Sequence, residues 1–157
     1  MRQFARDLHP ASMEELGLIT ALRTDCEFFS KAHKIPVRFS HRHIPPKPSA
    51  EVSLALYRIV QEGLSNVAQH AGNDTTLVQV TLRGTETGVE LTIQDNGRGF
   101  DPESARQRKG LGLISMEERA RALSGNFSIT STLRKGTEIK VQVLLEVAVA
   151  TTPNPAC

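Results

Sequence analysis

The chain of 157 residues contains no tryptophan, one tyrosine and two cysteines. Aromatic residues make up only 4% of it, so a hydrophobic core has to be built mainly from aliphatic side chains. Cys26 lies far from Cys157, the last residue of a proline-containing tail, so the pair forms neither a disulfide framework nor a metal-ligand cluster. Such sparse cysteine is typical of the reducing cytoplasm, which is the location we expect.

Long apolar runs and basic clusters are also missing. No stretch approaches the roughly 20 apolar residues that span a membrane, and the opening MRQFARDLHP lacks the apolar centre of a signal peptide. We therefore expect no membrane contact by this segment, although a longer parent protein could be anchored. The net charge is +2, and no Lys/Arg run alternates with aromatic residues, so nucleic-acid binding is not expected.

The hydrophobic fraction of 39% and charged fraction of 23% are ordinary for a globular protein of one domain with a short accessory element. A first helix is expected from Ser12, which forms a capping box with Glu15, to about Ala32. The clearest helix runs from Ser49, its N-cap, to Ala71, because its apolar residues fall on one broad face.

The remaining sequence predicts strands and one more helix. The run from Ile35 to Ile44 alternates loosely, and two pairs of alternating runs are each joined across glycine-containing turns, which indicates hairpins. This order of elements favours an α+β fold with a mixed sheet over a strict βαβ repeat. The predicted hairpin strands are 77–82 with 89–93 and 126–132 with 137–145, and the additional helix is 113–123.

Polar residues border the apolar face of the long helix. Glu62, Asn66 and His70 are spaced i, i+4 and i+8, so they stack on one side. A carboxylate and a carboxamide placed in this way supply oxygen ligands for Mg²⁺ and its waters, and the carboxylate could also accept a proton. Taken alone, the pattern favours a solvated helix edge.

The strand ending near Ile93 runs into Asp95-Asn96-Gly97-Arg98-Gly99-Phe100. A carboxylate at the end of a buried strand, followed by glycines that allow close backbone approach, suits a planar ring with an exocyclic amino group, such as adenine. The alternative is an Asx turn whose glycines adopt positive φ.

Two further motifs involve glycine. Gly110-Leu111-Gly112-Leu113 opens the next helix, where free backbone N–H groups and the helix dipole attract an anion, and basic residues at 106, 108 and 109 precede it. Gly136-Thr137 starts the last strand, where the hydroxyl could join a polar cluster. An ordinary tight turn and a strand threonine explain the same residues.

The order of these motifs resembles the N, G1 and G2 boxes of the GHKL ATPase superfamily, which includes gyrase, Hsp90, histidine kinases and MutL. The resemblance covers Ser49 to Leu145. Within that superfamily, LYRIVQEGLSNVAQHAG, DNGRGFDPE and GLGLISMEERARALSG are similar to sensor kinases that pair with NarL-type response regulators. The N-terminal RQFARDLHPASMEELGLITALR resembles the second helix of their dimerisation and phosphotransfer domain.

The resemblance implies a two-layer α/β sandwich of the Bergerat type, with a mixed sheet of about five strands and helices on one face. Residues 1–33 would be the end of the dimerisation helix and a linker, 34–147 the ATP-binding catalytic domain, and 148–157 a disordered tail. The reaction implied is transfer of the ATP γ-phosphoryl group to a histidine on a dimerisation helix, for relay to a response regulator. An ATP-gated clamp or degenerate partner subunit, or an anti-sigma-type serine kinase, is the alternative.

The resemblance also assigns roles. Asn66 would bind Mg²⁺, and Glu62 would hold a metal-bound water or assist proton removal from the acceptor imidazole. Asp95 would accept a hydrogen bond from the adenine amino group, with Thr137 joining through water. The other expected ATP-binding residues are Gly97 and Gly99 around adenine, Gly110 and Gly112 at the phosphates and as hinges of a short lid from Phe100 to Lys109, and His70, Lys109, Leu111 and Leu113.

Three features depart from the family pattern or limit it. Gln69 stands where many relatives have Lys or Arg, so a cationic phosphate contact is in doubt there. His70 could be a phosphate-side ligand or a stabiliser of the helix C-terminus. His9 precedes Pro10, which disfavours helical φ/ψ at His9, so we expect the chain to lack its own phosphoacceptor histidine.

Overall fold

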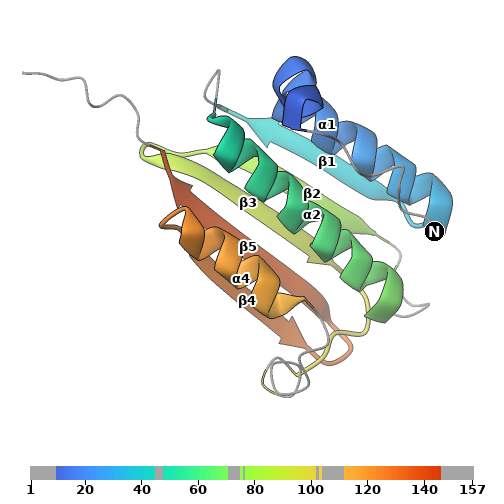
Figure 1. Ribbon diagram of the computed structural model, residues 1–157. Coiled ribbons are helices and arrows are strands. Elements are labelled where there is room, and N and C mark those ends of the chain that lie inside the picture. Colours follow the sequence, from blue (N-terminus) through green and yellow to red (C-terminus); the bar gives the residue numbers. More distant parts are fainter. Residues whose placement is uncertain are drawn as a thin grey trace, which may run out of the picture.

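Five strands form one mixed sheet, and helices cover one of its faces (Figure 1). The computed structural model describes residues 10–44, 48–70, 75, 77–101, 103 and 112–145, except the side chains of residues 10–16 and His70. The strand order is β1-β2-β3-β5-β4, with β1 parallel to β2 and the other neighbours antiparallel. The predicted α+β sandwich and both hairpins are confirmed. The strands are β1 Val37–Arg42, β2 Val78–Gly84, β3 Gly88–Asp95, β4 Asn126–Thr132 and β5 Gly136–Leu144.

The N-terminal helix α1, Pro10–His33, differs from its prediction in two ways. It begins at Pro10 rather than at Ser12, because the fixed φ of proline suits a first helical turn. The expected capping role of Ser12 is therefore wrong, since Ser12 lies inside the helix. Gly17, with φ 82° and ψ 154°, interrupts the helix in a conformation that glycine adopts far more readily than other residues.

Helix α2, Ala50–His70, begins as predicted. The Ser49 hydroxyl accepts a hydrogen bond from the Val52 N–H at 3.1 Å, and the Ser49 carbonyl accepts the Ser53 N–H at 2.9 Å. A serine cap of this kind contributes about 1 kcal/mol. Helix α4, Leu113–Ala122, lies beside α2 over the other half of the sheet (Figure 1). Among the described residues, no helix combines the length and apolar character needed to cross a membrane.

The core lies between the helices and one face of the sheet. Alternate strand residues point into it, and aliphatic side chains dominate, as the composition predicted. The second half of α1 also contributes, since Leu18, Leu22 and Phe29 are buried. The largest fully buried side chains are Tyr57, Phe29, Leu22, Leu56, Ile59, Leu64, Leu82, Leu91 and Met116.

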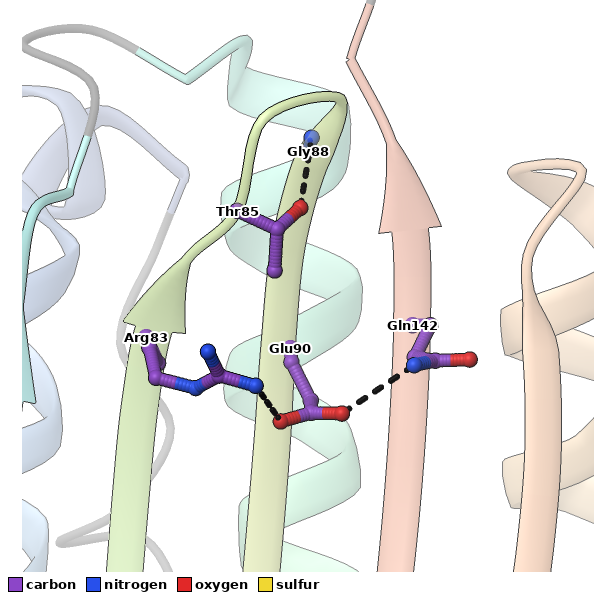
Figure 2. Close-up of polar contacts among 5 residues, drawn as sticks. All are labelled: Arg83, Thr85, Gly88, Glu90 and Gln142. Atoms are coloured by element: carbon purple, nitrogen blue, oxygen red, sulfur yellow. Dashed lines mark hydrogen bonds and ion pairs between the residues drawn. The ribbon is translucent and has the colours of Figure 1, made fainter.

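The opposite face of the sheet is polar. Figure 2 shows Arg83, Glu90 and Gln142, which face one another across β2, β3 and β5 in one register row. Arg83 pairs with Glu90 at 2.7 Å, and Gln142 donates to the other Glu90 oxygen at 3.1 Å. The hydrogen bond from Arg83 holds the pKa of Glu90 below its usual value. These contacts hold the three strands in register. The candidate functional site, described below, lies at the other end of the strands.

Candidate functional site

On the face of the sheet that packs against the helices, the last side chains of the strands are polar instead of apolar. Ile93 of β3 pairs with Ile139 of β5 in the core, and the next inward pair along is Asp95 with Thr137. Ser131 of β4 is the register partner of Thr137. Side chains two residues apart on a strand share a face, so Asp95, Thr137 and Ser131 point toward the helical layer.

A pocket opens at this place between the sheet and the C-terminal part of α2. Most of its walls are apolar, and Asn66, Asp95 and Thr137 supply its polar side chains. An apolar slot with a few convergent polar groups suits a flat heterocycle whose edge carries hydrogen-bonding atoms. The pocket is lined by Gly63, Asn66, Val67, Ile93, Asp95, Gly99, Phe100, Ile129, Thr137 and Ile139.

The Asp95 carboxylate is partly buried and closes the turn that follows it. Its Oδ1 accepts the Gly97 N–H at 2.8 Å, so the Asx turn considered as an alternative is present. Burial raises the pKa of Asp95 above its usual value, while backbone hydrogen bonds from Gly97 and Thr137 partly offset that effect. A carboxylate has about four lone-pair sites, so the turn leaves acceptor capacity for a ligand.

Two glycines let the Asp95 turn pack directly on the β4–β5 hairpin. Gly99 has φ +66°, and a Cβ on it would lie 2.1 Å from the Thr132 carbonyl oxygen. Gly136 has φ +104°, and a Cβ on it would lie 2.1 Å from the Asp95 carbonyl oxygen. No other residue fits either position without moving the backbone, which explains the glycine pattern of both motifs.

Glu62, one helical turn before Asn66 on α2, lies against the start of α4. Gly112 is the N-cap of α4 with φ 66°, and no side chain caps the helix there. A Cβ on Gly112 would lie 2.2 Å from Glu62 Oε1, so the carboxylate packs against the backbone at the helix start. A helix N-terminus carries partial positive charge, which favours a negatively charged group beside it.

The oxygens of Glu62 and Asn66 are chemically suited to Mg²⁺, which takes one or two protein ligands and completes its shell with substrate phosphates and water. Both side chains are partly exposed and lie one helical turn apart on α2. Within the described residues, no group of three or more His, Cys, Asp or Glu side chains gathers in a metal-binding arrangement. A magnesium ion at this place would therefore depend on a phosphate ligand.

The structure describes the other residues that the sequence singled out to different extents. Leu113 is buried in the core, and its side chain is not among those that line the pocket. Gln69 donates to the Ser65 hydroxyl at 3.2 Å along α2. Gly97 is buried, and its N–H is used by Asp95. The His70 side chain, Lys109, Gly110 and Leu111 lie outside the described residues.

Sequence reasoning missed Ser131. Its hydroxyl accepts the Phe100 N–H at 2.8 Å and lies 2.8 Å from the Thr137 hydroxyl. The signal was available, because Ser131 continues an inward row whose earlier members, Phe127 and Ile129, pack against the core. A polar residue at an inward position near Gly136-Thr137 indicates a polar cluster rather than a solvated strand.

Comparisons with known proteins identify the family of the chain. Residues 51–147 match the family described as histidine kinase-, DNA gyrase B-, and HSP90-like ATPase. The chain is 32% identical over 143 residues to the oxygen sensor histidine kinase NreB of Staphylococcus carnosus, covering 91% of this chain and 41% of that protein. It is 34% identical over 133 residues to the sensor histidine kinase MctS of Rhizobium johnstonii, covering 83% and 28%. The chain thus spans less than half the length of these curated relatives.

A solved structure shares the fold. The histidine kinase domain of the blue-light activated histidine kinase from Erythrobacter litoralis EL346 matches with a TM-score of 0.65 and 20% identity, over 82% of this chain and 61% of that one. The family match covers well over half of the chain, including α2, the Asp95 turn, α4 and the β4–β5 hairpin. The chain therefore belongs to the histidine kinase-, DNA gyrase B- and HSP90-like ATPase family, as an ATP-binding catalytic domain of the histidine kinase kind.

Proposed function

We propose that this domain binds Mg²⁺-ATP and transfers the γ-phosphoryl group to a histidine on a dimerisation helix, from which a NarL-type response regulator receives it. The observation that carries the proposal is the convergence of Asp95, Thr137 and Asn66 on one otherwise apolar pocket, with Glu62, one helical turn before Asn66, against the start of α4. In this proposal the pocket holds the base, and the start of α4 holds the phosphates.

Adenine fits the inner end of this site. Ile93, Ile139 and Phe100 offer apolar contact to the faces of a ring, and Asp95 offers an acceptor to its exocyclic amino group. Guanine would present a carbonyl oxygen where adenine presents that amino group, and two acceptors facing each other are unfavourable. The site should therefore prefer ATP to GTP.

The outer end fits phosphates. Glu62 lies against the backbone that begins α4, which is also where phosphates would benefit from the helix dipole. The Glu62 carboxylate and the phosphates are all negatively charged and would repel one another. A bound Mg²⁺ would neutralise part of this negative charge. Asn66 would help to hold it, and Glu62 would hold one of its waters or take the proton of the acceptor imidazole.

The proposed domain limits follow the same account. Residues 1–33 would be the end of a dimerisation helix and its linker, 34–147 the catalytic domain and 148–157 a tail, in a cytoplasmic part of the parent protein. The half of α1 after Gly17 packs on α2 and β1, so this linker would be in direct contact with the catalytic domain. Roles for His70, Lys109, Gly110 and Leu111 stay predictions from the sequence.

The chain is expected to bind ATP without labelling itself. His9 precedes Pro10 and is disfavoured from helical φ/ψ, whereas an acceptor needs the exposed face of a helix. Incubation with γ-labelled ATP and Mg²⁺ should leave the chain unlabelled, and a separate fragment carrying the acceptor helix of a relative should become labelled. Acid-labile label on the chain alone that disappears with His9→Gln would contradict this prediction. ATP binding without labelling of any acceptor fragment would favour a clamp or degenerate partner.

A further inference from the structure

A glycine lies in the interior of α2, on the side of the helix that faces the pocket. Gly63 follows Glu62 directly and lines the pocket together with Asn66 and Val67. It is helical, and it has no positive φ that would require glycine at this position. Glycine inside a helix is less favourable than alanine, because it loses more conformational freedom on folding. The backbone of α2 therefore does not explain Gly63, and the explanation has to come from the space around it.

The space beside Gly63 is filled by one side chain from the sheet. A Cβ on Gly63 would lie 2.7 Å from Ile93 Cδ1 and 3.4 Å from Ile93 Cγ2. Nonbonded carbon atoms usually approach one another to about 3.5–4.0 Å, so the first of these distances is an overlap. Ile93 thus occupies the place that the side chain of any larger residue at position 63 would need.

Ile93 bounds the pocket on the side of the core. It precedes Asp95 by two residues on β3, so both side chains lie on the helix-facing side of the sheet, and both line the pocket. Ile93 is buried at 3% exposure, whereas Asp95 is only partly buried. The direction in which Ile93 extends, toward α2 or toward the pocket, therefore sets the room that a base held at Asp95 can use.

A methyl group at position 63 would push Ile93 toward the pocket. Isoleucine is stiff at χ1 because it is branched at Cβ, so Cδ1 is the part of Ile93 that can turn most easily. On either side in the sheet, Ile93 is flanked by its register partners Val80 and Ile139, which are both buried. Since a protein core is close-packed, the space open to a displaced Cδ1 is the pocket itself.

We propose that Gly63 is a specificity-determining residue, because it lets Ile93 pack against the backbone of α2 and so keeps the pocket deep enough for the two fused rings of a purine base. This inference rests on the proposed function, in which Asp95 holds the exocyclic amino group of that base. Gly63 and Ile93 act as a pair, since the volume absent from one is taken up by the other. A larger side chain at position 63 would leave room only for a smaller or more shallowly bound base.

The test is calorimetry with ATP on Gly63→Ala, on Ile93→Val and on the double variant. Gly63→Ala should weaken ATP binding about 10- to 100-fold, because one misplaced methylene in an apolar pocket is worth about 10- to 200-fold in discrimination. Ile93→Val removes Cδ1, the atom that the added methyl group would strike. The double variant should therefore bind ATP within about 3-fold of Ile93→Val alone, a non-additive result that is typical of residues in direct contact.

Thermal unfolding without nucleotide separates this role from simple packing of the fold. Alanine improves the helix propensity at position 63 while Ile93 has to turn, so the Tm of Gly63→Ala should stay within about 4 °C of the wild-type value. The control is Ser65→Ala, because Ser65 lies on the same helix and is not among the residues that line the pocket. This variant should keep the wild-type affinity for ATP.

Wild-type ATP affinity in a folded Gly63→Ala protein would overturn the inference, as would a double variant that binds ATP as weakly as Gly63→Ala. If Gly63→Ala does not fold, the double variant decides, because the added methyl group then has room. ATP binding close to that of Ile93→Val would support the inference, and loss of binding would overturn it. Failure of the wild-type chain to bind ATP at all would overturn the proposed function, and this inference with it.

Discussion

Replacement of Asp95 by asparagine is expected to weaken ATP binding by about 10- to 150-fold, because a charge-assisted hydrogen bond is worth roughly 1.5 to 3 kcal/mol. Asparagine keeps an oxygen that can accept the Gly97 N–H, so the turn should survive. The ligand loses a charged acceptor and can meet the amide N–H₂ instead. Calorimetry with ATP and GTP in the presence of Mg²⁺ should show the loss for ATP and a narrower preference for ATP over GTP.

The thermal stability of Asp95→Asn shows whether weaker ATP binding comes from a lost contact with the ligand or from loss of the fold. Burial raises the pKa of Asp95, so the folded state disfavours the charged carboxylate. The resulting loss of folding free energy is fully present at pH values above the raised pKa. Asparagine removes this cost, and thermal unfolding at neutral pH should occur at the same temperature or higher. Unchanged ATP affinity in a folded Asp95→Asn protein would remove Asp95 from base recognition.

Replacement of Glu62 by glutamine is expected to slow phosphoryl transfer by about 10²- to 10⁴-fold, the usual range for a general acid or base, with a smaller effect on ATP binding. Glutamine keeps the shape of the side chain against Gly112 but cannot accept a proton. The measurement is the single-turnover rate of labelling of an acceptor-helix fragment at saturating ATP, together with the ATP dissociation constant.

Asn66→Asp is the matched comparison, because Asn66 lies one helical turn from Glu62 and lines the pocket. It adds charge at the metal position, so its effect should fall on the Mg²⁺ dependence of binding and transfer. A Glu62→Gln variant that transfers phosphate at the wild-type rate would show that Glu62 is not the proton acceptor.

Much of the fold could be predicted because local signals were unambiguous. Ser49 caps α2 as its sequence position indicated, and the alternating strands pair as the two hairpins that the turns implied. Asp95 and Thr137, far apart in the sequence, are register partners at the end of the sheet. Periodicity places such residues on a face, and the family resemblance implied one mixed sheet, but the order of strands that brings them together came only from the structure.

Features set by tertiary packing were not accessible in the same way. The helical periodicity on both sides of Gly17 predicted one continuous helix, because a backbone break at one glycine leaves the surrounding apolar pattern intact. Leu113 was assigned to ligand binding from its motif, and its burial in the core was not indicated by that motif. Ser131 was missed because it belongs to no motif, although its inward position on β4 was a usable signal, and its contacts with Phe100 and Thr137 form only in the folded chain.

The most direct test of the central claim is an experimental structure of the chain with Mg²⁺ and a non-hydrolysable ATP analogue. The account predicts that the adenine lies between Ile93, Ile139 and Phe100, with its amino group donating to Asp95. It also predicts phosphates at the start of α4 beside Glu62 and Asn66. A nucleotide bound on the polar face of the sheet around Glu90, or one whose base lies outside the pocket that Asp95 lines, would contradict it.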